Sequence, residues 1–271
     1  MRVVDTFEST QNHRYVLELA DHARVEAVVY RGNTLCVSSQ VGCAVRCPFC
    51  ASGKDGLGRN LSVEELVAEL DTIRLLHPNI AYVTVSGIGE PLHNFSNVEK
   101  FITHCRAQRI APSFTTSGAT PERLRNAMLW PHNGITVSVH AGSELVRARL
   151  VPKAPSLDEL FATLADVVPT LSQSRKRKVA LAYLLMREVN DSDDEIDRFI
   201  ARALPLGRAV HLYAYNPVDS SETRPVSRER YQSVYERMRT QGLVVRMSSK
   251  ARTEANGGCG TLVALRKNRT S

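Results

Sequence analysis

The sequence lacks the features that would place the chain in a membrane or direct it out of the cell. No apolar run among its 271 residues approaches the roughly 20 residues that a membrane-spanning helix needs. The first eight residues, from Met1 to Glu8, contain no apolar core of a signal peptide. The chain also has no low-complexity segment, internal repeat or long linker. We therefore expect a cytoplasmic protein without a membrane partner.

The six cysteines do not form the pattern of a disulfide framework. Three of them fall in one loop, which favours metal and thiol chemistry in a reducing compartment. A hydrophobic fraction of 43% supports a packed core, and 23% charged residues is ordinary for a soluble protein. The net charge of +7 permits a polyanionic partner such as RNA, although many basic proteins bind no nucleic acid.

The most informative stretch is a loop that has three cysteines and no fourth. Cys43, Cys47 and Cys50 follow the spacing C-x3-C-x2-C. Clusters that only carry electrons usually have four cysteine ligands. Three thiolates hold three irons of a [4Fe–4S] cluster and leave the fourth open to a ligand, as in catalytic metal sites. Half of a zinc site or three unrelated buried thiols are the alternatives, but no second CxxC or H-x3-H pair follows at zinc spacing.

Strands and helices alternate about six times after this loop. We expect strands at residues 81–86, 113–116, 134–140, 178–186, 209–216 and 243–247, with helices between them. Such alternation is typical of parallel βαβ units, and there are too few units for an eight-stranded barrel. We therefore predict an α/β fold, a partial (βα)6 barrel over residues 36–271. A short β extension with strands at 15–19 and 25–30 precedes it over residues 1–35.

Serines mark the starts of several of these helices. Ser62 and Glu65 predict a capping box, and Ser156 and Ser227 are further candidate caps. The one charge run, Arg-Lys-Arg-Lys at residues 175–178, precedes a strand. It indicates either a solvated turn or a contact to RNA phosphates.

Residues 34–50 resemble the cluster loop of radical S-adenosylmethionine (SAM) enzymes, and more narrowly that of the RlmN/Cfr family of RNA adenine methyltransferases. Phe49 stands where that family has an aromatic residue. The resemblance implies a radical SAM fold, a [4Fe–4S] cluster on the three cysteines, and S-adenosylmethionine chelated by the open iron. It also implies an RNA substrate and an electron donor such as flavodoxin or ferredoxin; we favour a monomer.

The resemblance runs from about residue 24 to residue 262. Family members usually carry a helical accessory domain before the first matching strand, and that domain helps to grip RNA. This chain has only about twenty residues there, so we expect a short form that lacks the domain.

Several expected strands end in polar residues that match the family's cofactor contacts. Strand ends are where parallel α/β folds gather their chemistry. By resemblance, the cofactor-binding residues are Gly89, Glu90, Thr115, Ser138, Val139, His140 and Asn216. Taken alone, these residues fit ordinary turns and strand ends. A lone histidine is more often a structural hydrogen-bonding group than a catalyst, so we assign His140 no proton transfer.

Two cysteines outside the loop match the family's catalytic thiols. Cys259 lies between glycines in Gly-Gly-Cys-Gly-Thr-Leu, and Cys36 lies seven residues before Cys43. Alone, they fit one small buried apolar residue and one loop thiol. The resemblance implies that Cys259 carries a methyl group during catalysis and that Cys36 then forms a disulfide with it. Glu26 matches the family's proposed base, the alternative being an outward-facing strand glutamate.

The resemblance predicts methylation of an sp2 carbon of adenine, C2 or C8, in ribosomal or transfer RNA, with two SAM molecules used per turnover. Two alternatives stay open. One is a radical SAM C-methyltransferase that acts on a small molecule or peptide. The other is a cluster-bearing RNA-binding protein without turnover.

Overall fold

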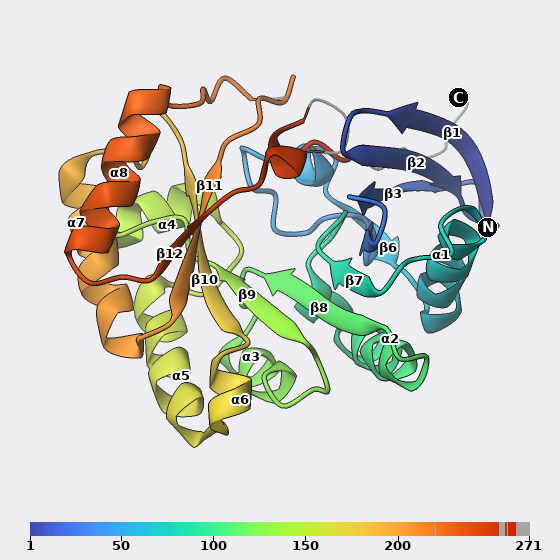
Figure 1. The fold of residues 1–271 in the computed structure, drawn as a ribbon, viewed down its shortest axis with the longest axis horizontal. Coiled ribbons are helices and arrows are strands. Elements are labelled where there is room, and N and C mark those ends of the chain that lie inside the picture. The colour runs from blue at the N-terminus through green and yellow to red at the C-terminus, as the bar shows by residue number, and fades with distance from the viewer. Residues whose placement is uncertain (220, 255–257, 259, 264–271) are drawn as a thin grey trace.

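The computed structural model describes residues 1–219, 221–254, 258 and 260–263 (Figure 1). Its strands are β1 (Arg2–Glu8), β2 (Asn12–Glu18), β3 (Arg24–Tyr30), β4 (Thr34–Val37), β5 (Gln40–Gly42), β6 (Leu57–Asn60), β7 (Tyr82–Val85), β8 (Ala111–Thr116), β9 (Gly134–Ser138), β10 (Val179–Leu185), β11 (Ala209–Ala214) and β12 (Val245–Met247). Its α-helices are α1 (Val63–Leu76), α2 (Phe95–Ala107), α3 (Pro121–Ala127), α4 (Glu144–Leu150), α5 (Leu157–Thr170), α6 (Gln173–Lys176), α7 (Asp193–Ala203) and α8 (Arg228–Thr240).

One large sheet runs through the described part of the chain in the order β1-β2-β3-β4-β7-β8-β9-β10-β11-β12. From β4 to β12 neighbouring strands are parallel, whereas β1, β2, β3 and β4 pair antiparallel. The predicted α/β partial barrel and its β extension are therefore confirmed. The sequence analysis missed β1, β4 and the β5–β6 hairpin, which flanks the cysteine loop.

The two faces of the parallel strands differ in character. Val37, Val85, Phe114, Ile135 and Val179 stand in register across five strands, and each is at most 2% exposed. This apolar row faces the helices. The next row along the strands is Cys36, Thr84, Ser113 and Gly134, and side chains of adjacent residues point to opposite faces. The inner face of the barrel is therefore lined by small and polar groups, which leaves room for a ligand.

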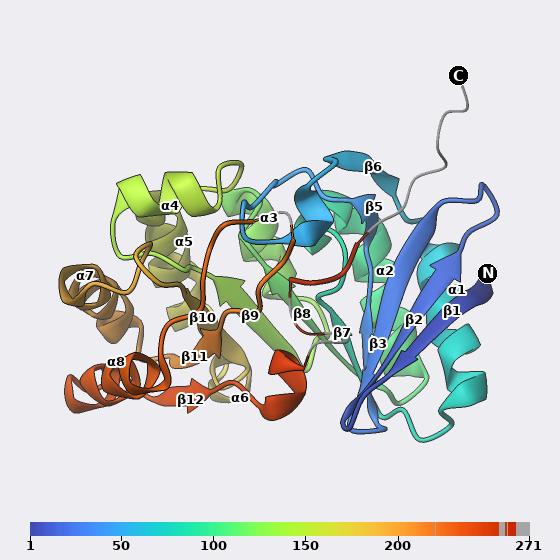
Figure 2. The same cartoon turned by 90° about the horizontal axis from the view of Figure 1, so that it is seen from above.

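The helices start where the sequence predicts them. Ser62 with Glu65 and Ser156 with Glu159 form complete capping boxes, and Ser227 caps α8. Figure 2 shows α5, α7 and α8 at one end of the sheet and α1 beside the N-terminal strands at the other. Within the described residues, no helix combines the length and apolarity that crossing a membrane requires.

The basic run at residues 175–178 has a structural role at its first residue. The Arg175 guanidinium donates to the carbonyls of Met128, Leu129 and Trp130, just after α3, at 2.9–3.3 Å. The run also precedes β10, so it lies at the opposite end of the barrel from the strand ends that would bind a cofactor. Of the two interpretations, this geometry favours the structural turn.

A buried glutamate on α1 fixes the end of β4. Glu69 is fully buried; its Oε1 accepts from Ser38 N at 3.0 Å, and its Oε2 has no hydrogen-bond partner in the described part of the chain. Burial raises the pKa of this carboxyl well above its usual value. Ser38 Oγ in turn donates to Glu26 O and accepts from Ile88 N, so three segments meet at one serine.

This arrangement predicts how folding stability depends on pH. Because the pKa of Glu69 is higher in the folded state than in the unfolded state, its contribution is present at acid pH and is lost as pH rises above about 4.5. Glu69→Gln should remove that loss, so the variant gains stability relative to wild type between pH 5 and pH 8. The free energy of unfolding, measured by urea denaturation at pH 5 and at pH 8, tests this prediction. The exposed Glu99→Gln is the control, and equal pH slopes in wild type and Glu69→Gln would contradict the prediction.

Candidate cofactor site

The three loop cysteines line one cavity at the carboxyl ends of the strands. Cys43, Cys47 and Cys50 form one side of it. Strand-end residues form the opposite side, among them Ser86, Gly89, Glu90, Thr115, Thr116, Ser117, Ser138 and His140. The structure therefore brings together all three predicted cluster ligands and five of the seven predicted cofactor-binding residues.

A small hydrophobic cluster packs against the cysteine loop. Val45, Phe49, Leu150, Val151, Met186 and Tyr215 form a small core of their own, and the three cysteines pack against it. Burial raises the pKa of Cys43 to about 12 and that of Cys47 well above its usual value. Such thiols stay protonated until a metal displaces the proton. Three partly buried thiols on a single cavity are the donor set of a [4Fe–4S] cluster that has one open iron.

Glu90 ties the loop after β7 to the end of β8. Its Oε1 accepts from Leu92 N and the Thr116 hydroxyl, at 3.1 and 2.5 Å. Its Oε2 accepts from Ser117 N and Ser117 Oγ, both at 2.7 Å. These four donors fill the roughly four lone-pair sites of a carboxylate. An ammonium group at Glu90 would therefore take the place of a hydroxyl donor, and its role toward a cofactor stays a prediction.

Gly89 is required by packing within the protein. It has φ of +112°, and a Cβ there would lie 2.6 Å from Ser39 Oγ and 2.8 Å from Gln40 Cβ. The glycine thus lets the loop after β7 press against the segment that leads into the cysteine loop. Gln40 Oε1 also accepts from Glu90 N at 2.8 Å, which locks the two segments together.

Arg147 is a buried arginine that holds two strand ends. It is 1% exposed, and its guanidinium donates to the carbonyls of Ser117, Ser138, Val139 and Pro155 at 2.7–3.3 Å. Burial lowers the pKa of Arg147 to about 10, and the nearby Cys47 opposes that shift. The positive charge therefore lies close to the cysteine loop. The sequence analysis assigned no role to Arg147, Thr116 or Ser117, because their contacts join segments far apart in the chain.

His140 makes structural contacts, and its contact with a cofactor stays a prediction. Its Nδ1 accepts from Leu184 N at 3.0 Å, and its ring contacts Phe49 edge-on, with centroids 5.6 Å apart. Burial, helped by Arg147, lowers the pKa of His140 to about 3, so the ring stays neutral.

Two predicted cofactor contacts lie outside the residues that line this cavity. Val139 is fully buried, and its carbonyl accepts from Arg147. Asn216 donates from Nδ2 to Arg252 O at 2.7 Å, and a Cβ on Gly258 would lie 2.7 Å from that same Nδ2. Asn216 therefore supports the C-terminal segment, and its contact with a cofactor stays a prediction.

Cys36 and Glu26 lie near the same end of the barrel. Cys36 is 2% exposed, and its Sγ is 3.3 Å from the hydroxyl of Ser86, a residue that lines the cofactor cavity. Cys36 pairs with Val28 in the sheet, and Glu26 lies two residues before Val28 on the same face. Glu26 is 5% exposed, so the alternative of an outward-facing glutamate is wrong.

Residues 260–263, which follow Cys259 in the sequence, run past the cysteine loop. Cys259 itself lies outside the described residues. Gly260 O accepts from Ala51 N at 2.9 Å, and Leu262 O accepts from Ser52 Oγ at 2.8 Å. Val263 N donates to Glu26 Oε2 at 3.4 Å. Residues 260–263 thus contact both the loop that carries the cluster ligands and the buried glutamate.

Comparisons with known proteins agree with this geometry. Residues 37–200 match the model of the radical SAM superfamily. A probable RNA methyltransferase from Ectopseudomonas mendocina is 32% identical over 93% of this chain and 73% of its own. A probable dual-specificity RNA methyltransferase RlmN from Trichodesmium erythraeum is 29% identical over 93% of this chain and 75% of its own. Among solved structures, a radical SAM methyltransferase from Sphaerobacter thermophilus superposes with a TM-score of 0.83 at 27% identity, covering 96% of this chain and 80% of that one.

The extent of these matches identifies the family. They span the cysteine loop, the strand ends and nearly the whole barrel. Radical SAM proteins use a [4Fe–4S] cluster and S-adenosylmethionine, and the three partly buried thiols on one cavity fit that cluster. The chain is an enzyme of the radical SAM superfamily and belongs, within it, to the family of the RlmN-type probable RNA methyltransferases.

Proposed function

We propose that this enzyme methylates an sp2 carbon, C2 or C8, of adenine in RNA through a methylated Cys259. One observation carries the proposal. Residues 260–263 are bonded to Ala51 and Ser52 beside the cluster ligands and also to Glu26. A thiol carried by this segment would act between a cluster-bound cofactor and a buried base. The RNA methyltransferase names of the relatives support RNA as the substrate.

The chemistry explains why a relay thiol is needed. The C2 and C8 carbons of adenine and the methyl group of a sulfonium are all electrophilic, so direct polar transfer between them is mismatched. When bound, the cluster and S-adenosylmethionine supply the methyl group and a hydrogen-abstracting radical, with two SAM molecules used per turnover. A flavodoxin- or ferredoxin-type donor would provide the electron.

The protein's own residues would perform the remaining steps. The Cys259 thiolate takes the methyl group by displacement, and its methyl carbon, after losing a hydrogen atom, bonds to the adenine ring. Glu26 accepts the proton from the ring carbon, and the adduct gives up one electron, for which the cluster, when bound, would be the acceptor. The Cys36 thiolate then attacks the Cys259 sulfur and forms a disulfide; the electron pair of the broken sulfur–carbon bond goes to the methylene carbon, which takes up a proton to complete the methyl group on adenine.

The environment of Glu26 suits a general base. Burial raises its pKa to about 7, only partly offset by Arg14, whose Nη1 is 3.6 Å from Glu26 Oε2. A base works best when its pKa lies near the operating pH. Arg14 and Val263, both contacts of Glu26, line a cavity of about 410 Å³ together with Lys54 and Asp219. That volume is of the size that holds a small ligand or a single base.

Labelled S-adenosylmethionine tests the function directly. Anaerobic, reduced enzyme incubated with methyl-labelled S-adenosylmethionine and total RNA from cells that lack the protein should place label in RNA. Mass spectrometry of the digested RNA should find it on an adenine carbon. Label that reaches only small molecules or peptides would reject the RNA proposal, and a failure to form 5′-deoxyadenosine would reject radical chemistry altogether.

The role of Glu26 predicts a pH dependence. A general base must be ionised, so the methylation rate should rise through about pH 7 and level off above it. Glu26→Gln should lower the rate by about 100-fold or more, because general bases contribute at least that much. The exposed Glu8→Gln on β1 is the control. A flat wild-type profile between pH 6 and pH 8, or wild-type turnover by Glu26→Gln, would remove the assignment.

The relay predicts a trapped adduct. In Cys36→Ala the bond to adenine can form but cannot be resolved, so a covalent protein–RNA species should accumulate on a denaturing gel. It should disappear when Cys259 is also replaced. Cys105, fully buried in α2, gives the matched control, because Cys105→Ala should trap nothing. If Cys36→Ala yields no crosslink with RNA that wild type methylates, the thiol relay is wrong.

A further inference from the structure

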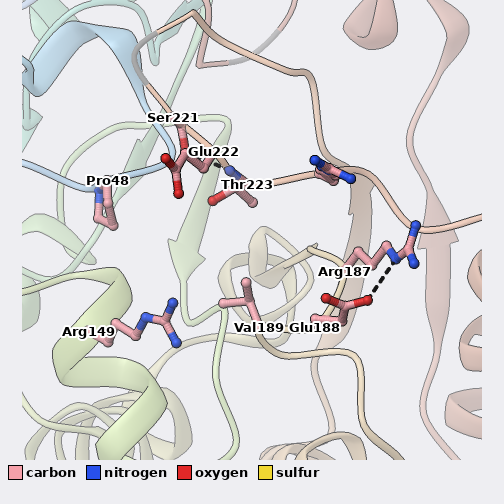
Figure 3. Close-up of a pocket in the computed structure, with 9 residues that line it drawn as sticks. Pro48, Arg149, Arg187, Glu188, Val189, Ser221, Glu222 and Thr223 are labelled. Atoms are coloured by element: carbon pink, nitrogen blue, oxygen red, sulfur yellow. Dashed lines mark hydrogen bonds and ion pairs between the residues drawn. The ribbon is translucent and has the colours of Figure 1, made fainter.

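A second, larger cleft lies beside the cysteine loop. It has a volume of about 1010 Å³ and is bounded by Pro48 of that loop, Arg149 of α4, residues 187–189 after β10 and residues 221–224 after β11. In Figure 3, Arg149 and Arg187 stand on either side of Val189, and Ser221, Glu222 and Thr223 lie along the facing segment. The segments from β10 and β11 follow the carboxyl ends of their strands, so the cleft opens at the same end of the barrel as the cofactor cavity.

The arginine side chains in this cleft make few contacts that stabilise the fold. Arg149 and Arg224 are exposed, and neither guanidinium forms a hydrogen bond or ion pair with a described residue. Arg187 pairs only with its neighbour Glu188, at 3.1 Å, and both side chains are more than half exposed. A solvent-exposed pair of this kind contributes little. Three guanidinium groups from three separate segments therefore face one open cleft, together with the carboxylates of Glu188 and Glu222.

The structural arginines of this chain are held quite differently. Arg147 donates to four carbonyls, and Arg175 donates to three. Arg237 makes a two-pronged contact with Asp197 at 2.6–2.7 Å. Arginines that support the fold are thus occupied by acceptors. Those in the cleft are available to an external anion, and a guanidinium is well matched to phosphate oxygens.

The cleft and the cavity beside Glu26 share one loop. Residues 217–219 line that cavity, and residues 221–224 line the cleft. Asp219 and Ser221 are two positions apart, so their Cα atoms are separated by at most roughly 7 Å. The two sites are therefore close enough for one short strand of a flexible polyanion to contact both.

We propose that this arginine cleft binds backbone phosphates of the single-stranded RNA that flanks the target adenine, with Arg149 and Arg224 as the main contacts. The inference rests on the proposed function, since it names how that substrate is held. An open, polar, concave surface beside a base-sized cavity suits a single strand whose base is turned inward. An acidic electron-donor protein is the competing occupant.

The double variant Arg149→Gln/Arg224→Gln tests the cleft. Binding of a short, fluorescent single-stranded oligoribonucleotide that contains adenine should weaken by about tenfold or more. The slope of log K against log salt should fall by roughly 1.4, which is two contacts at about 0.7 each.

Glu222→Gln should tighten RNA binding, because it removes a negative charge from the cleft. Arg177→Gln is the control, since this exposed arginine lies at the opposite end of the barrel. Iron content should match wild type in every variant.

The outcomes separate the inference from the function. If the double variant binds RNA with wild-type affinity and salt slope while methylation persists, the cleft proposal is wrong and the function stands. If RNA binding is unchanged but reduction of the cluster by a flavodoxin slows, while reduction by dithionite does not, the cleft is a donor-docking surface and the proposal is overturned. If wild type binds RNA through these arginines but never methylates it, the function fails and the cleft remains an RNA site.

Discussion

The site depends on how the carboxyl ends of the strands are fixed without filling the barrel. Closed (βα)8 barrels pack their interior with layers of large side chains. Here the inner row of Cys36, Thr84, Ser113 and Gly134 consists of small or polar residues. Side-chain packing inside the barrel therefore does little to fix the positions of the strand ends. Buried ionisable groups take over that role by hydrogen bonding to backbone atoms.

Three buried side chains make most of these contacts with the backbone. Glu69 holds Ser38, Glu90 holds Ser117, and Arg147 holds the carbonyls of Ser117 and Ser138. A hydrogen bond to a charged group such as Arg147 contributes about 1.5–3 kcal/mol, which offsets part of the cost of burial. Each bond also sets the position of a segment that faces the cofactor cavity. The same contacts therefore serve stability and the shape of the site.

The sequence predicted the parts of this structure that local physics determines. Alternating strands and helices imply a parallel sheet, and Ser62 with Glu65 fixes a helix start within four residues. The spacing of Cys43, Cys47 and Cys50 predicts a cluster loop, and these thiols do share one cavity. The resemblance to a family added Cys36 and Glu26, which the structure places near the same end of the barrel.

The contacts that complete the site are long-range and have no local signature. Arg147 reaches Ser117, thirty residues away, and Val263 reaches Glu26 across most of the chain. Strand β1 was missed because its sequence, Arg-Val-Val-Asp-Thr-Phe-Glu, alternates poorly; it is stabilised by pairing with β2. The basic run at 175–178 is the one run of like charge in the sequence. Its first residue, Arg175, donates hydrogen bonds to the backbone carbonyls just after α3.

Glu26 and Glu90 show why burial alone does not assign a role to a carboxyl group. They are 5% and 4% exposed. Glu90 accepts four hydrogen bonds, which occupy its lone-pair sites. Glu26 has one amide donor at 3.4 Å and one arginine at 3.6 Å, so desolvation dominates and its pKa rises to about 7. Near that pKa a proton can be taken up or released at little cost. The loosely held carboxyl is therefore suited to proton transfer, whereas the saturated one is suited to holding backbone segments in place.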